Sequence, residues 1–204
     1  MIVILDYGMG NVGSILNMLK KIGAQAILSH DHNEIIQADK IILPGVGAFD
    51  SGMKALQKYN LIDVLEYQVV EKKKPLLGIC LGMQMLGRKS EEGVLPGLGF
   101  IPFDNIRFSF PPELNLKIPH MGWNQIKTQA AAALTKSLPD KERYYFVHSY
   151  HAKCDNSENI LMTCDYGYEF TAAVYRENIF GVQFHPEKSH SFGMRILKNF
   201  AEEC

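Results

Sequence analysis

The stretch Pro75-Leu-Leu-Gly-Ile-Cys-Leu-Gly-Met-Gln84 places one cysteine between two glycines, at the point where an apolar run meets a helical pattern. This is the strand–turn–helix elbow pattern G-x-nucleophile-x-G, with Cys80 in the nucleophile position. The glycines permit the sharp turn, and the backbone N–H of Leu81 is a natural donor to an oxyanion formed near the thiol. Taken alone, the segment also fits a buried core cysteine beside a glycine packing contact, so the rest of the chain has to decide.

Upstream of the elbow, short β-branched runs alternate with amphipathic stretches. This alternation predicts parallel βαβ units, and Gly23 is a typical stop for the first helix. The predicted strands are Ile2–Tyr7, Ala26–Ser29, Lys40–Leu43 and Pro75–Ile79, and the predicted helical regions are Val12–Ile22, Asp50–Lys74 and a helix from about Leu81.

From Gly97 onward, prolines and aromatic residues cluster among short strand-like runs. This half is predicted to be more antiparallel and to close with an amphipathic helix at Ser191–Glu203. The predicted strands of this half are Tyr144–Tyr150, Ile160–Cys164, Thr171–Arg176 and Ile179–Phe184. The whole pattern therefore predicts an α/β fold with a central, mostly parallel sheet, flanking helices and antiparallel additions in the second half.

Length and composition narrow the class of protein. A chain of 204 residues fits one domain, and 47% hydrophobic with 21% charged residues excludes disordered and fibrous classes. The net charge of −1 argues against nucleic acid and anionic membranes as partners. The most apolar stretch, Pro75–Leu86, is far shorter than the roughly 20 residues that cross a bilayer. The N-terminal segment Met1–Asp6 has no basic leader and does not resemble a signal peptide, so a cytoplasmic location is expected. The four cysteines form no C-x-x-C pair, which argues against a zinc site or a disulfide framework.

A dinucleotide site is an alternative suggested by Gly8-Met-Gly-Asn-Val-Gly13, which fits G-x-G-x-x-G between a predicted strand and helix. Asp31 follows the second strand, where an acid could bind a ribose. The simpler interpretation is a tight turn that needs glycine for its dihedral angles.

A nucleophilic cysteine needs a base, and the base needs an orienting group. Phe184-His-Pro-Glu187 follows an apolar strand and supplies both, with His185 as the base and Glu187 two residues away, on the same side of an extended chain. A second oxyanion donor is expected from Pro44-Gly-Val-Gly47, a loop after the third predicted strand whose glycines allow a peptide flip.

Three segments together, Pro44–Gly47, Gly78–Gln84 and Phe184–Ser189, resemble the triad-type (class I) glutamine amidotransferases. Within that class, His120-Met-Gly-Trp-Asn124 and Tyr145-Phe-Val-His-Ser-Tyr150 are similar to the glutaminase subunits of imidazole glycerol phosphate synthases. The resemblance spans Asp6 to the last helix and implies one glutamine amidotransferase type 1 domain over residues 1–204, with a flavodoxin-like fold.

The resemblance also implies the roles of individual residues. Cys80 is the nucleophile, His185 the general base and acid, Glu187 the orienting acid, and the amides of Val46 and Leu81 form the oxyanion hole. The implied glutamine contacts are Gly47, Gln84, Glu92, His148, Ser149 and Tyr150, and the residues expected to face a partner are Asn11, Trp123, Tyr145 and Lys188. The substrate is L-glutamine, no metal or organic cofactor is required, and the ammonia enters a partner synthase of the (β/α)₈ cyclase type in a heterodimer.

Three alternatives stay open at this point. The same glutaminase could serve a sugar amidotransferase in surface polysaccharide synthesis, because relatives of that kind share every catalytic motif. A stand-alone Cys-His hydrolase would use the same triad without a partner. A non-catalytic dinucleotide-binding module would use Gly8–Gly13.

Overall fold

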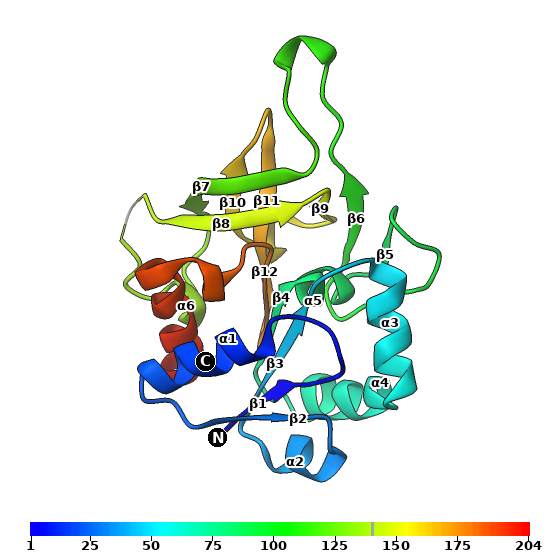
Figure 1. Ribbon diagram of the computed structural model, residues 1–204, viewed down its shortest axis with the longest axis vertical. Coiled ribbons are helices and arrows are strands. Elements are labelled where there is room, and N and C mark those ends of the chain that lie inside the picture. The colour runs from blue at the N-terminus through cyan, green and yellow to red at the C-terminus, as the bar shows by residue number, and fades with distance from the viewer. Residues whose placement is uncertain (140) are drawn as a thin grey trace.

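The computed structural model describes residues 1–139 and 141–204, and its core is one twisted sheet with helices on both faces (Figure 1). Along the main path the strands are ordered β2-β1-β3-β4-β12-β11-β10-β7-β8. The parallel part comprises β2 (Ala26–Ser29), β1 (Ile2–Leu5), β3 (Lys40–Gly45), β4 (Leu76–Cys80) and β12 (Ile179–Val182). The antiparallel part comprises β11 (Glu169–Arg176), β10 (Ile160–Asp165), β7 (His120–Thr128) and β8 (Arg143–His148), with β5 (Lys89–Ser90), β6 (Phe103–Arg107) and β9 (Tyr150–Cys154) off this path.

The parallel strands are buried on both faces, which explains their almost uninterrupted apolar sequences. In β1, Ile2 and Ile4 face the layer formed by α1 (Val12–Lys21) and α6 (His190–Glu203). Val3 and Leu5 point to the other side, because successive side chains of a strand alternate. The helical elements of that second layer are α2 (His32–Gln37), α3 (Phe49–Lys58), α4 (Leu61–Leu65), a π-helical turn (Glu66–Glu71) and α5 (Leu81–Met85).

The first half of the chain matches the predicted elements closely, and the differences have local causes. The predicted helical region Asp50–Lys74 is interrupted at Asn60, which adopts a left-handed conformation with φ +54°. The sequence pattern does not predict helix α2, since its six residues bury only Ile35 and show no apolar periodicity.

Two predictions for the second half are corrected. The sequence pattern groups Ile179–Phe184 with the antiparallel strands; β12 is indeed antiparallel to β11, but it inserts between β11 and β4 and runs parallel to β4. It also predicts one strand over Tyr144–Tyr150, but β8 ends at His148 and β9 starts at Tyr150, so that Ser149 lies at a break. No helix in residues 1–139 and 141–204 has the length and apolar content needed to cross a membrane.

The parallel strands position the site, because the carboxyl ends of β3, β4 and β12 meet at one edge of the sheet. The ribbon of β7 and β8 lies across this end of the molecule (Figure 1). Residues that follow these strand ends therefore come together although they are far apart in sequence.

Candidate active site

Cys80 ends β4 in a backbone conformation that non-glycine residues rarely adopt, with φ +54° and ψ −109°. Such a conformation costs on the order of 1–3 kcal/mol and persists only when its surroundings impose it. Two glycines impose it here. A Cβ on Gly82 would lie 1.8 Å from the carbonyl oxygen of Leu43, and one on Gly78 would lie 2.8 Å from that of Gly82. The elbow predicted from the sequence is thus built by close backbone packing of α5 on β3 and β4.

His185 follows β12, the strand hydrogen-bonded to β4, and it therefore reaches the same sheet edge as Cys80. Its Nδ1 lies 2.8 Å from Oε1 of Glu187, and both side chains are almost completely buried. The predicted pair is thus present, but the physical reason expected for it is wrong: Pro186–Lys188 forms a 3-10 turn rather than an extended segment. The turn, and not strand alternation, directs the carboxylate back onto the imidazole.

The electrostatic environment of His185 favours the imidazolium. Burial acts to lower the pKa of His185, but the neighbouring Cys80 sulfur and the Glu187 carboxylate outweigh it and raise that pKa to about 10. The Nε2 atom of His185 is buried and makes no hydrogen bond with the part of the chain that the structure describes. With Nδ1 engaged by Glu187, Nε2 is the atom left to exchange a proton with a bound molecule.

A cavity of about 620 Å³ opens beside these two residues and collects most of the predicted site. Glu187, Asn11, Trp123 and Tyr145 do not line it, whereas Ala48, Pro119 and Val147 line it although the sequence does not single them out. The predicted residues in its wall are Val46, Gly47, Cys80, Leu81, Gln84, Glu92, His148, Ser149, Tyr150, His185 and Lys188.

The loop after β3 forms one wall of this cavity and is held from two sides. The buried Tyr7 hydroxyl donates to the carbonyl oxygen of Pro44. A Cβ on Gly45 would lie 2.9 Å from the Cβ of Leu81, so the loop packs directly on the start of α5. Val46 is exposed at the cavity, and Gly47 has φ +101°, a value that favours glycine.

A family model described as class I glutamine amidotransferase matches residues 3–204 of the chain. The chain belongs to the class I glutamine amidotransferase family. Two relatives, from Pseudomonas aeruginosa and Methanococcus maripaludis, are each named imidazole glycerol phosphate synthase subunit HisH 2. The first is 54% identical over 202 residues, which is 99% of this chain and 99% of the relative. The second is 55% identical over 204 residues, 100% of both chains.

Solved structures with this fold are more distant in sequence. One that is described as a glutamine amidotransferase matches with a TM-score of 0.74 at 18% identity, covering 98% of this chain and 97% of its own. PurLQS from Thermotoga maritima gives the same TM-score and identity, covering 98% of this chain and 96% of its own. These likenesses confirm the predicted fold class.

The amidotransferase carries an exposed aromatic patch next to the cavity. Trp123, 41% exposed, stacks on His190 with ring centroids 5.5 Å apart and planes at 4°. Lys188 lies over the ring of Tyr145, 5.7 Å from its centroid. Asn11 is also exposed, in the loop before α1.

The glycine-rich loop before α1 has a packing role in this amidotransferase. Gly8 and Gly10 have φ of +83° and +94°, and a Cβ on Gly10 would lie 3.0 Å from the Cβ of Pro44. Asp31, the residue considered for ribose binding, caps α2 by accepting hydrogen bonds from the N–H groups of Asn33 and Glu34. The backbone angles of Gly8 and Gly10, the packing of Gly10 on Pro44 and the cap formed by Asp31 explain these three residues without a dinucleotide.

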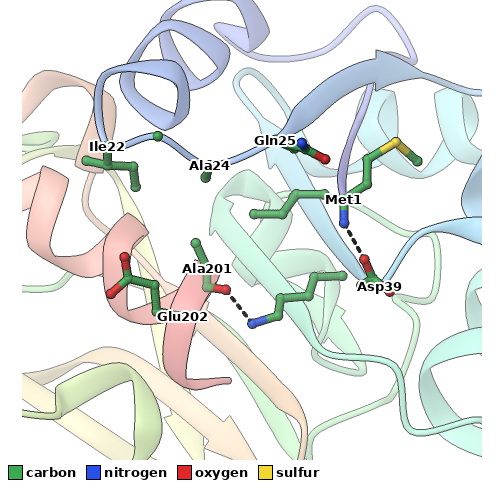
Figure 2. Close-up of a pocket in the computed structure, with 10 residues that line it drawn as sticks. Met1, Ile22, Ala24, Gln25, Asp39, Ala201 and Glu202 are labelled. Atoms are coloured by element: carbon green, nitrogen blue, oxygen red, sulfur yellow. Dashed lines mark hydrogen bonds and ion pairs between the residues drawn. The ribbon is translucent and has the colours of Figure 1, made fainter.

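A second cavity, of about 430 Å³, lies at the opposite, amino-terminal ends of the parallel strands (Figure 2). The ammonium group of Lys40 donates to the carbonyl oxygens of Phe200 and Ala201 near the end of α6, at 2.9 and 2.7 Å. The terminal ammonium of Met1 pairs with Asp39. Both cationic groups at this cavity are therefore engaged, and it contains none of the predicted site residues.

A pair of buried histidines supports the cavity wall. Nδ1 of His148 lies 2.8 Å from the carbonyl oxygen of Tyr150, which can only accept, so this nitrogen carries the proton. Nε2 of His148 is then an acceptor for Nδ1 of His120, 3.1 Å away. Burial lowers the pKa of His148 to about 3 and that of His120 to about 4. Both imidazoles are consequently neutral at neutral pH.

We expect this histidine pair to make the fold acid-sensitive. In the folded state, the pKa values of both histidines lie below the unfolded value of about 6.5. The contribution of the two histidines to the stability of the fold is therefore complete above about pH 6.5 and is lost as the pH falls toward 4. When the pH is lowered from 7 to 5, the free energy of unfolding should fall by roughly 2 kcal/mol for each histidine. Urea unfolding of wild type, His120→Gln and the exposed control His32→Gln at both pH values measures this. A pH dependence unchanged in His120→Gln would contradict it.

Proposed function

We propose that this amidotransferase is the glutaminase subunit of an imidazole glycerol phosphate synthase in histidine biosynthesis. It hydrolyses L-glutamine to glutamate and ammonia and passes the ammonia to a synthase subunit. The observation that carries the hydrolase chemistry is the strained Cys80 elbow beside the buried His185–Glu187 pair, at a common cavity. The names of the two full-length relatives support the choice of synthase.

The chemistry follows from the charges in the site. With His185 as imidazolium, Cys80 attacks the side-chain amide carbon of glutamine as a thiolate. The backbone N–H groups of Val46 and Leu81 receive the negative charge that develops on the amide oxygen. His185 gives the Nε2 proton to the departing nitrogen. Ammonia is released, and the glutamyl group remains bound to Cys80 as a thioester. The same imidazole then takes a proton from water, whose attack releases glutamate and the thiolate, while Glu187 holds the ring in place.

Glutamine is proposed to bind in the cavity of about 620 Å³. Glu92 accepts a hydrogen bond from the N–H of Phe49 at 2.8 Å, which fixes one carboxylate oxygen and supports its use as the counterion of the substrate ammonium group. Gln84 is held by the carbonyl oxygen of Tyr150 at 3.2 Å and lies in the same wall. Gly47 and the segment His148, Ser149 and Tyr150 are proposed to supply backbone contacts.

The partner is proposed to be a (β/α)₈ cyclase subunit, in a cytoplasmic heterodimer. Asn11, Trp123, Tyr145 and Lys188 are proposed to face it, and their exposure or position beside the cavity supports this assignment. We propose further that residues 1–204 form one glutamine amidotransferase type 1 domain, because the family match covers residues 3–204 and α1 and α6, from the two ends of the chain, pack in one layer on the same sheet.

Reconstitution with a cyclase subunit tests the proposal. The mixed subunits should convert the cyclase's acceptor to imidazole glycerol phosphate with glutamine as the nitrogen source, in step with glutamate release. A complex that forms glutamate but aminates only a sugar acceptor would assign the chain to a different synthase. Glutamate release that is the same with and without partner would favour the stand-alone hydrolase.

We expect the isolated chain to hydrolyse glutamine slowly and the partner with its acceptor to accelerate it by about 10²–10³. The reason is the loop Pro44–Gly47, where glycines on both sides of Val46 let one peptide flip between two states. If the resting state directs a carbonyl at the oxyanion position, one donor is missing, which costs about 3–4 kcal/mol. Binding of the partner then selects the state with the donor.

Glutamate production by the chain alone, with partner, and with partner plus acceptor measures this acceleration. Cys80→Ala in the same mixtures gives the background. Three equal rates would mean that the oxyanion hole is preformed.

A further inference from the structure

Gln183 does not stand out by its sequence context, but it lies directly behind the nucleophile. It follows β12, and its side chain is completely buried. Its backbone N–H donates to the carbonyl oxygen of Ala172 at 2.8 Å, which fixes its position on the sheet. A buried side-chain amide is costly unless its donors and acceptor are used, so its partners show its role.

The hydrogen bonds around Gln183 can run in only one direction. The carbonyl oxygen of Tyr150 is purely an acceptor, and it receives Nδ1–H of His148 as well as Nε2–H of Gln84. The amide of Gln84 must therefore present its NH₂ group here. The same NH₂ group lies 3.0 Å from Oε1 of Gln183, which accepts its second hydrogen.

This order leaves the NH₂ group of Gln183 facing the nucleophile. Nε2 of Gln183 lies 3.8 Å from the Cys80 sulfur, within the range of an N–H···S contact. The carbonyl oxygen of Tyr150 fixes the amide of Gln84, and Gln84 in turn fixes the amide of Gln183. A flipped Gln183 would place its oxygen against a thiolate and its NH₂ group against that of Gln84.

We propose that Gln183 is a catalytic residue that donates a hydrogen bond to the Cys80 sulfur, and that Gln84 sets its orientation. The proposal rests on the function proposed above and deepens it. The donor favours the thiolate over the thiol, as hydrogen bonding to a charged form always does. It stabilises the sulfur again when water attacks the thioester and the carbon–sulfur bond breaks, because the electron pair of that bond returns to sulfur.

The arrangement also couples the wall of the substrate cavity to the nucleophile. Gln84 lines the cavity and touches Gln183, and Gln183 touches the sulfur. A shift of Gln84 on substrate binding would be felt at Cys80 through two amide groups. Both groups are uncharged, so the effect depends on hydrogen-bond geometry alone.

The pH dependence of Cys80 alkylation by iodoacetamide tests the proposal with a small, uncharged probe. Gln183→Met keeps the length of the side chain and removes the donor. We expect the midpoint of the alkylation profile to rise by about one pH unit, which means a roughly tenfold lower rate below the midpoint. Gln183→Glu places a carboxylate oxygen against the sulfur and keeps the acceptor for Gln84, and it should raise the midpoint further.

Controls separate this inference from the proposed function. Gln68→Met replaces another buried glutamine far from the site and should leave the profile unchanged. Cys80→Ala shows how much label the other cysteines take. A profile of Gln183→Met that superimposes on wild type, with glutaminase activity still dependent on Cys80, would overturn the role of Gln183 alone. If the methionine variant does not fold, Gln183→Leu takes its place, because it also removes the donor and adds no charge beside the sulfur.

Discussion

Cys80→Ala should reduce glutamine hydrolysis by roughly 10⁴-fold or more, because loss of a nucleophile removes the covalent route and leaves only the weak catalysis of the remaining site. The fold should persist, since alanine removes only the sulfur atom of a side chain at a position whose backbone is fixed by Gly78 and Gly82. Glutamate release in the presence of partner and acceptor measures the loss of hydrolysis. Labelling by a glutamine-mimicking electrophile measures the loss of the reactive thiol.

Cys154→Ala is the matched control for this variant, because Cys154 is also a free thiol but lies on β9, outside the cavity. Burial raises the pKa of Cys154 to about 11, so it should remain a thiol and stay unlabelled. Turnover that survives in Cys80→Ala and disappears in Cys154→Ala would sink the assignment of the nucleophile.

His185→Ala should lower glutamine-dependent product formation by roughly 10³-fold or more, while added ammonium salt restores the synthase reaction. Under the proposed function, this chain supplies the base and acid for amide hydrolysis, and the partner carries out the chemistry on the acceptor. Loss of the imidazole therefore removes the ammonia supply and nothing else. The measurement is synthase turnover by the reconstituted complex with glutamine and then with ammonium chloride.

The exposed His32 provides the control, since His32→Ala should keep both activities. A complex of His185→Ala that is inactive with ammonium as well would contradict the division of labour between the subunits. Binding of the variant to its partner should be checked in the same preparation, because a failure to assemble would also abolish the ammonium-dependent reaction.

The local parts of the site could be predicted from the sequence, because their geometry depends on residues that are close together in the chain. Gly78 and Gly82 around Cys80 predict the elbow, and the short spacing of His185 and Glu187 predicts that their side chains meet. Even there, the sequence could not distinguish a 3-10 turn from an extended segment.

The long-range parts could not be predicted, since they depend on which strands pair. Nothing near Ile179–Val182 states that this strand pairs with β4 rather than only with its hairpin partner β11. Gln183 escapes prediction for the same reason, because its meaning lies in its depth and in its contacts with Gln84 and Cys80, about a hundred residues earlier. Asp31 suggests a ligand site because a helix cap and a ribose acid look alike in sequence.

The insertion of β12 between β4 and β11 has a consequence for the protein during its synthesis. Strand β4, which carries Cys80, leaves the ribosome about a hundred residues before β12, one of its two neighbours. Until β12 arrives, the edge of β4 that faces it has unpaired backbone groups. The nascent chain at that stage already holds Cys80, the proposed nucleophile, but has neither His185, the proposed base, nor the Gln183 amide beside it. Chains that end before β12 should therefore be unable to release ammonia, and glutaminase activity should begin only after β12 has been made and has paired with β4.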